Sequence, residues 1–267
     1  MESIGFEPVE RQIANVAPPR TPWRLDFPPV VVHTALALRD GHPLYTAAKS
    51  GGEDAALALS QDLLSASATA SLRQLPEADG ATLLPITALE MTGFNAIPDA
   101  MAQVLGRELG WPVSSGLIVQ NNRVGHTRAP SFNRLVTPAA FEGEVTNGER
   151  YVLVDDHVGL GGTLANLRGH IETNGGLVVA MTTITESRDA RHIALRPETL
   201  VMIREKHGEA LENLWQDSFG HGLECLTELE GRILCREQTV DTIRGRLAQA
   251  AIEAHGRGLE PAIRIAD

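Results

Sequence analysis

The chain has 267 residues, a formal net charge of -11 and 43% hydrophobic residues. This length suits one α/β domain with an appendage, or two small domains, and the apolar fraction allows a sizeable core. No run of about 18 apolar residues occurs, so we expect neither a membrane span nor a membrane partner. Because an acidic chain is repelled by the phosphate backbone, we expect no nucleic-acid partner.

The cysteines and the N-terminus indicate the compartment. Cys225 and Cys235 form no CxxC pair, so they are typical of reduced thiols, although a bridge between them stays open. Residues 1–10 carry acidic groups and lack the basic, apolar pattern of a signal peptide. We therefore expect a cytoplasmic protein.

The first half of the chain begins with a proline-rich segment, residues 1–29, which is either an extended arm wrapping the domain or a flexible tail. Residues 30–38 predict a strand and residues 53–64 a helix. A strand at 81–86 leads through a loop to a second helix, with Asn95 as N-cap and Gly110 as its stop.

Strands are predicted next at 115–120, 149–154 and 177–184, with a helix at 163–173. This alternation predicts an α/β core over residues 30–190, with a mainly parallel sheet and helices on both faces. Helices at 197–215 and 239–255 then form a helical C-terminal appendage, residues 191–267.

Residues 151–164, Tyr-Val-Leu-Val-Asp-Asp-His-Val-Gly-Leu-Gly-Gly-Thr-Leu, carry the clearest chemical pattern. A buried strand ends in two acids, Asp155 and Asp156, and a glycine-rich turn opens a helix. Glycines let the backbone N–H groups of residues 159–163 converge on one point, and the helix N-terminus adds positive potential. The pattern predicts a monophosphate site beside carboxylates that can accept hydrogen bonds from vicinal hydroxyls, which is the spacing of a ribose 5-phosphate.

These residues resemble the type I phosphoribosyltransferases, whose motif is an apolar strand, two acids, four variable residues and Gly-Gly-Thr. The resemblance implies that Asp155 and Asp156 bind the ribose hydroxyls of phosphoribosyl pyrophosphate. It also implies that the 5-phosphate lies on a loop of five residues: Gly159, Leu160, Gly161, Gly162 and Thr163. Leu160 departs from the family, which usually has a hydroxyl residue there, and His157 stands where an apolar residue is common.

The family holds pyrophosphate on a second loop, which corresponds here to residues 86–95. The resemblance assigns the anion to the N–H groups of Thr92, Gly93, Phe94 and Asn95, and a magnesium-bound water to Glu90. The other interpretation is a plain strand–helix loop capped by Asn95. Mg²⁺ is expected with the pyrophosphate, and no residue is firmly assigned as its ligand.

A third loop of the family closes over the site, and residues 121–136 occupy its position. Arg128 and Arg134 are its candidate catalytic residues because arginine suits the charge on departing pyrophosphate; Arg123 and His126 lie in the same segment. A solvated surface loop is the alternative. Lys49 is interpreted as a solvated lysine rather than a phosphate ligand, and residues 186–192 lie where relatives contact the acceptor.

The resemblance implies a pentosyltransferase of nucleotide metabolism, a homodimer in the cytoplasm. It would transfer the phosphoribosyl group to a nitrogenous acceptor and release pyrophosphate. No side-chain nucleophile is required, and the sequence has no Ser–His or Cys–His signature. One alternative is a catalytically weak or inactive regulator that senses the donor or a nucleotide. Another is a nucleotide hydrolase or phosphotransferase, but its Walker A lysine motif is absent.

Overall fold

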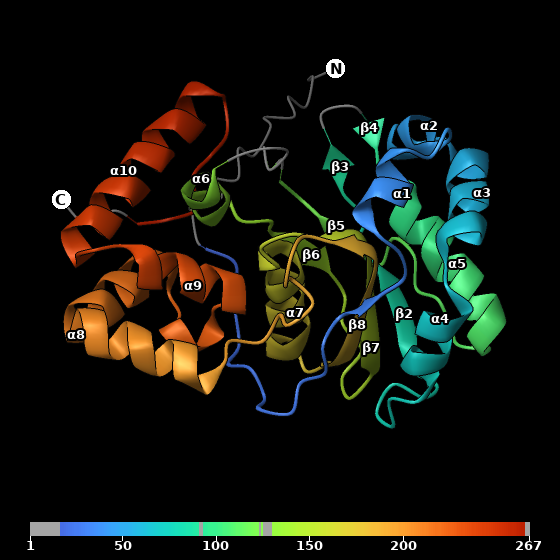
Figure 1. The fold of residues 1–267 in the computed structure, drawn as a ribbon, viewed down its shortest axis with the longest axis horizontal. Helices are drawn as coiled ribbons and strands as arrows, with labels where there is room; N and C mark the ends of the chain where they lie inside the picture. The colour runs from blue at the N-terminus through green and yellow to red at the C-terminus, as the bar shows by residue number, and fades with distance from the viewer. Residues whose placement is uncertain (1–16, 91–92, 123, 125–129, 265–267) are drawn as a thin grey trace, which may run out of the picture.

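The computed structural model describes residues 17–90, 93–122, 124 and 130–264. Four strands form a parallel sheet at its centre, in the order β1-β8-β7-β2 (Figure 1). Their bounds are β1 (Val31–Val32), β2 (Thr82–Pro85), β7 (Arg150–Val158) and β8 (Leu177–Glu186). The predicted parallel α/β core is therefore confirmed.

Helices cover both faces of this sheet, because side chains of successive strand residues point to opposite sides. Val152 and Val154 pack towards α3 (Glu53–Leu63), α4 (Ala66–Arg73) and α5 (Ile97–Leu109). Tyr151 and Leu153 pack towards α7 (Gly162–Thr173) on the other face. Figure 1 shows α7 and the α3–α5 group on either side of the strands.

The predicted strand at 30–38 is wrong beyond its first residues. β1 spans only Val31–Val32, and α1 (Leu36–Asp40) and α2 (Tyr45–Lys49) follow. β1 is an edge strand, and after Thr34, whose N–H still donates to the carbonyl of Ile184, the chain leaves the sheet. Leu36 and Leu38 are exposed, so their apolar character did not report a buried strand.

Beyond β2 the sheet is extended by an irregular parallel segment, because Val113 bridges to Leu83 and Val119 to Thr87. Of the strand predicted at 115–120, only β5 (Ile118–Gln120) is regular, and it pairs antiparallel with β6 (Phe141–Gly143). Between them lies a short helix, α6 (Ser131–Val136).

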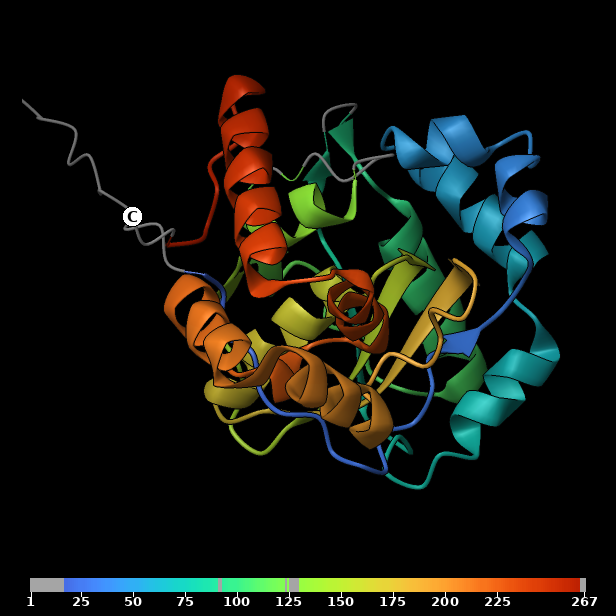
Figure 2. The same cartoon turned by 60° about the vertical axis from the view of Figure 1, so that its left-hand side comes forward.

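The C-terminal appendage is helical, as predicted. It comprises α8 (Pro197–Phe219), a 3-10 turn η1 (Leu223–Cys225), α9 (Glu228–Arg236) and α10 (Val240–Gly256) (Figure 2). Its apolar core contains the stacked rings of Trp215 and Phe219, and it also includes residues of α6. Among the helices in the described residues, none is both long and apolar enough to cross a membrane.

The described part of the proline-rich segment, residues 17–29, runs between α7 and the appendage. The indole of Trp23 donates to the carbonyl of Leu226 (2.7 Å), and Arg168 of α7 donates to the carbonyls of Thr21 and Pro22. Gly169 makes this approach possible, because a Cβ there would lie 1.9 Å from the Pro19 carbonyl oxygen. Residues 19–23 of the segment are therefore a packed arm, whereas Leu25 further along is 90% exposed.

Candidate functional site

The two acids lie inside the last part of β7 rather than after it. β7 runs to Val158, four residues beyond the predicted end, because β8 also continues and pairs Asp155 with Thr183 and His157 with Thr185. Strand alternation places Asp156 on the side of Val152 and Val154, towards α2. Both carboxyl groups remain at the carboxyl edge of the sheet, where α/β proteins bind ligands.

A cavity of about 590 Å³ opens at this edge. Its walls come from separate parts of the chain: the arm, α1–α2, the end of β7, the loop 159–163 with the start of α7, α6 with Pro138 after it, Ser187 after β8, and Glu230 of α9. Asp155, Asp156, Arg134 and the whole loop from Gly159 to Thr163 line it. The structure therefore brings together the predicted acids, the predicted phosphate loop and one of the predicted arginines.

The loop 159–163 has backbone donors that no protein group uses. Within the described residues, none of its five N–H groups donates to a protein acceptor. Gly161 adopts a left-handed conformation, with φ of 85°, and α7 begins directly after it. A Cβ at Gly161 would lie 3.0 Å from the side chain of Ile193, so glycine is required for its conformation and for the close approach. Donors, helix N-terminus and cavity together make an anion site.

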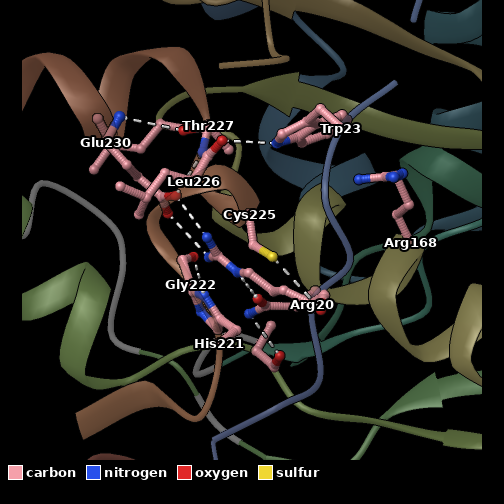
Figure 3. A network of polar contacts seen from close by, with 12 residues as sticks. Arg20, Trp23, Arg168, His221, Gly222, Cys225, Leu226, Thr227 and Glu230 are labelled. Atoms are coloured by element: carbon pink, nitrogen blue, oxygen red, sulfur yellow. Dashed lines mark hydrogen bonds and ion pairs between the residues drawn. The ribbon is translucent and has the colours of Figure 1, made fainter. Parts of the chain in front are cut away.

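The loop is held from the outside by the appendage and the arm. The hydroxyl of Thr227 donates to the carbonyl of Leu160 (2.6 Å). Arg20 makes two hydrogen bonds to Glu230, of 2.6 and 3.0 Å, and a third to Asn166 (2.6 Å). Figure 3 shows Arg20 of the arm extending towards Glu230 of α9, beside Thr227, the N-cap residue of that helix.

Arg20 and Glu230 lie directly against the start of α7. A Cβ at Gly162 would be 3.0 Å from Glu230 Oε1 and 3.3 Å from Arg20 Nη2. Burial opposes ionisation of Glu230, but the charge of Arg20 outweighs it and the pKa of this carboxyl is lowered. The ion pair is thus formed within the protein. Sequence analysis missed both residues because 210 positions separate them.

The two acids are not equivalent. Asp156 is buried, and burial opposes its ionisation, but Lys49 Nζ at 2.9 Å and Arg39 Nη1 at 3.8 Å lower its pKa. Asp155 has its pKa raised well above the usual range, first by burial and then by the charge of Asp156. The two carboxyl groups therefore differ in acidity, because Asp156 loses its proton more readily than Asp155. Lys49, interpreted from sequence as solvated, is instead a partner of Asp156.

Arg134 lies on α6, beside the first residue of the phosphate loop. A Cβ at Gly159 would be 3.1 Å from Arg134 Nη1, and burial lowers the pKa of the guanidinium. The segment 121–136 thus contains a short helix and contributes at least one cation to the cavity. Arg123, His126 and Arg128 lie outside the described residues.

The second predicted loop has a different structure. Its backbone forms a hairpin of β3 (Leu89–Glu90) and β4 (Gly93–Phe94), and none of its described residues lines the cavity. Asn95 is buried and its side chain accepts from the N–H of Ile97, so it caps α5, although Ala96 is the N-cap position. Thr92 lies outside the described residues, as does the side chain of Glu90. Pyrophosphate binding here stays a prediction.

A Ser–His pair that the sequence did not reveal also lies at this edge. His157 Nε2 is 3.1 Å from Ser187 Oγ, and His157 Nδ1 is 2.9 Å from Thr185 Oγ1. The residues are 28 to 30 positions apart and meet only because β7 and β8 are paired in this register. Within the described residues, no group of three or more His, Cys, Asp or Glu side chains is placed to hold a metal ion.

Comparison with known proteins gives relatives without a stated activity. No family model matches the chain. It is 42% identical to Protein TraN of Escherichia coli over 238 residues, which is 89% of this chain and 53% of TraN. An uncharacterized protein of Haemophilus influenzae is 39% identical over 152 residues, 57% of this chain and 34% of that protein. The chain thus spans about half the length of TraN and about a third of the length of the Haemophilus influenzae protein.

Solved structures with partial similarity include two from Leishmania donovani. UMP synthase matches with a TM-score of 0.31 and 17% identity, over 52% of this chain and 24% of that one. Adenine phosphoribosyltransferase matches with a TM-score of 0.31 and 19% identity, over 50% of this chain and 53% of that one. At these scores the similarity decides neither fold nor function.

Proposed function

We propose that the chain is a phosphoribosyltransferase that takes phosphoribosyl pyrophosphate as donor. The proposal rests mainly on the loop from Gly159 to Thr163. Its five backbone N–H groups have no acceptor among the described residues, and they lie at the start of a helix, on the wall of a cavity of about 590 Å³. Two carboxyl groups, Asp155 and Asp156, lie on the same wall. A sugar phosphate needs this arrangement: N–H groups that donate hydrogen bonds to its phosphate, and carboxyl groups close to its hydroxyl groups.

The unequal acids suit a vicinal diol, because each hydroxyl group both donates and accepts. Asp156, held ionised by Lys49 and Arg39, would accept from one hydroxyl group. Asp155, whose raised pKa makes it hold a proton more readily, would donate to the other hydroxyl group. In the proposed reaction a nitrogen lone pair of the acceptor attacks the anomeric carbon, and the bond from that carbon to pyrophosphate oxygen breaks.

Positive charge for the departing pyrophosphate is available in the cavity. Arg39, Lys49 and Arg134 all line it, and such preorganised cations stabilise developing negative charge. Mg²⁺ would arrive with the pyrophosphate as part of the substrate. We propose this cation set in addition to Arg128 and to the hairpin loop 86–95, which the resemblance assigned to the same task.

A regulator that binds the donor without turnover is the second candidate. It is favoured by the hairpin β3–β4, because the family's pyrophosphate loop has no counterpart among the described cavity residues. Release of pyrophosphate distinguishes the two functions, since both require donor binding and only the enzyme requires transfer.

The experiment is a thermal-shift and calorimetric titration with phosphoribosyl pyrophosphate, with and without Mg²⁺. We expect stabilisation of about 2.7 kcal/mol at a donor concentration of 100 Kd. The double variant Asp155→Asn with Asp156→Asn should abolish it. The control is Glu53→Gln with Asp54→Asn, an exposed pair of neighbouring acids at the start of α3, which should bind like the wild type. Undiminished donor binding by the first double variant would refute the diol assignment.

A further inference from the structure

His157 is held between two hydroxyl groups of the neighbouring strand end, and the hydrogen-bond network assigns its tautomer. Thr185 Oγ1 lies 3.3 Å from the carbonyl oxygen of Asp156. A carbonyl oxygen cannot donate, so the proton in this contact comes from the Thr185 hydroxyl. Having given its proton there, Thr185 accepts from Nδ1–H of His157, at 2.9 Å. The lone pair of His157 Nε2 then faces Ser187 Oγ, at 3.1 Å, and accepts the hydroxyl proton. For the neutral imidazole, this is the one arrangement in which each of the three contacts has its own proton.

The pair lies on the cavity wall rather than in the core. Ser187 and His157 both line the cavity, and a Cβ at Gly159 would be 4.0 Å from Ser187 Oγ. Ser187 is therefore next to the start of the phosphate loop, one strand away from the acids. With the donor bound to the loop and the acids as proposed above, Ser187 would lie beside the sugar, on a side open to a second substrate.

The imidazole is poised as a base. Burial lowers the pKa of His157, and so does Arg39 of α1. The other charged groups that face it are Asp40 of α1, Lys49 of α2 and Asp156 of its own strand, while the facing groups of β8 are the neutral hydroxyls. A nucleophile–base pair within hydrogen-bond reach, with a third group orienting the base, is the arrangement that proton transfer requires.

We propose that Ser187 and His157 form a proton relay that deprotonates the acceptor, an inference that rests on the proposed transferase function. As the acceptor nitrogen bonds to the anomeric carbon and pyrophosphate leaves with its bonding electrons, the N–H proton passes to Ser187 Oγ. The hydroxyl proton of Ser187 passes to His157 Nε2, which becomes an imidazolium stabilised by Asp156. The acceptor class is thus a neutral compound with a proton on its attacking nitrogen.

To test the relay, donor binding and turnover are measured on the same wild-type and variant proteins. Pyrophosphate release from phosphoribosyl pyrophosphate with Mg²⁺ is followed with free purine and pyrimidine bases as acceptors. Ser187→Ala and His157→Gln should lower kcat by about 10²- to 10⁴-fold and leave donor affinity unchanged. Ser187→Thr should restore part of the rate, and Ser71→Ala, an exposed serine of α4, is the control. The wild-type rate should fall on acidification with a pKa below that of an ordinary histidine, and His157→Gln should lack this limb.

Nuclear magnetic resonance of histidine labelled with ¹⁵N tests the geometry without turnover. The expected result is a His157 signal of the Nδ1–H tautomer that shifts in Ser187→Ala. An Nε2–H tautomer, full activity of both relay variants, or a wild type that binds the donor but releases no pyrophosphate with any acceptor would each overturn the relay. Failure of the wild type to bind the donor is a separate result, and it would overturn the proposed function itself.

Discussion

Two loops follow neighbouring parallel strands of one sheet and end at the same edge, yet they are built differently. The loop 159–163 after β7 keeps its N–H groups without protein acceptors in the described residues and lines a cavity. The loop 86–95 after β2 folds into the β3–β4 hairpin, and its Asn95 side chain is used to cap α5. Position at a strand end is common to both, but the two loops differ in how their polar groups are used within the protein.

The difference lies in what holds each loop. The hairpin is stabilised by bonds within itself and to its own helix, and the N–H of Ala96 donates to Ala48 of α2. The phosphate loop is instead held by contacts that do not use its N–H groups. Thr227 donates to the Leu160 carbonyl, and the Arg20–Glu230 pair packs against Gly162. Among the described residues, this external support uses none of the N–H groups of the loop, which stay available to a ligand.

The largest effect is expected when that external support is removed. Arg20→Ala leaves Glu230 buried without its cation, which should cost about 3–5 kcal/mol in the free energy of unfolding, measured by urea denaturation. Donor affinity should fall at least about tenfold, because the loop loses its flank. Arg24→Ala removes a pair with Glu77 whose side chains are 46% and 54% exposed, and it should cost about 0–1 kcal/mol. Equal losses of stability and donor affinity in Arg20→Ala and Arg24→Ala would contradict the inference that the buried Arg20 pair supports the phosphate loop.

A smaller effect is expected in the hairpin loop, and it should concern stability alone. Asn95→Ala removes the acceptor of the Ile97 N–H and should cost about 1–2 kcal/mol, with donor affinity unchanged. Asn95→Asp keeps the acceptor oxygen and places its charge at a helix N-terminus, so it should be better tolerated. The measurements are urea denaturation and donor titration. Loss of donor affinity in Asn95→Ala would show that the Asn95 side chain supports ligand binding as well as the start of α5, contrary to its expected structural role.

The smallest effect is a gain in stability from a variant of the site. Because the pKa of Asp155 is raised in the folded protein, the unfolded chain releases this proton first as pH rises, and stability falls above the unfolded pKa of about 4. Asp155→Asn removes the titration, so it should be about 1 kcal/mol more stable than wild type at pH 7, roughly 2–4 °C in Tm. The gain should shrink towards pH 4. Exposed Asp79→Asn should show no such pH-dependent gain.

Local patterns predicted the parts of the fold that depend on local sequence. The helices α3, α5, α7 and α10 and the central strands were predicted within a few residues, because their apolar spacing and end residues agree with their burial. α6 and α9 were missed since their apolar residues are few and pack in the appendage core or against it. β7 was predicted too short because polar residues after Val154 ended the apolar run, although pairing with β8 continues.

The candidate site shows the same division. The acids and the glycine loop are contiguous in sequence, so a motif could predict them. Three further pairs of the site join distant segments, and no spacing rule connects their members. They are Arg20 with Glu230, Lys49 with Asp156, and Ser187 with His157. Such pairs exist only after the sheet register and the course of the arm are fixed.

The path of the arm also has a consequence for the order in which the protein matures on the ribosome. Arg20 is synthesised early, but its partner Glu230 follows 210 residues later. The βα unit around β7 and α7 can therefore form while the flank of its glycine loop is still missing. Only when α9 has emerged can the first and last parts of the chain meet at this loop, so anion binding should be acquired as one of the final steps of folding.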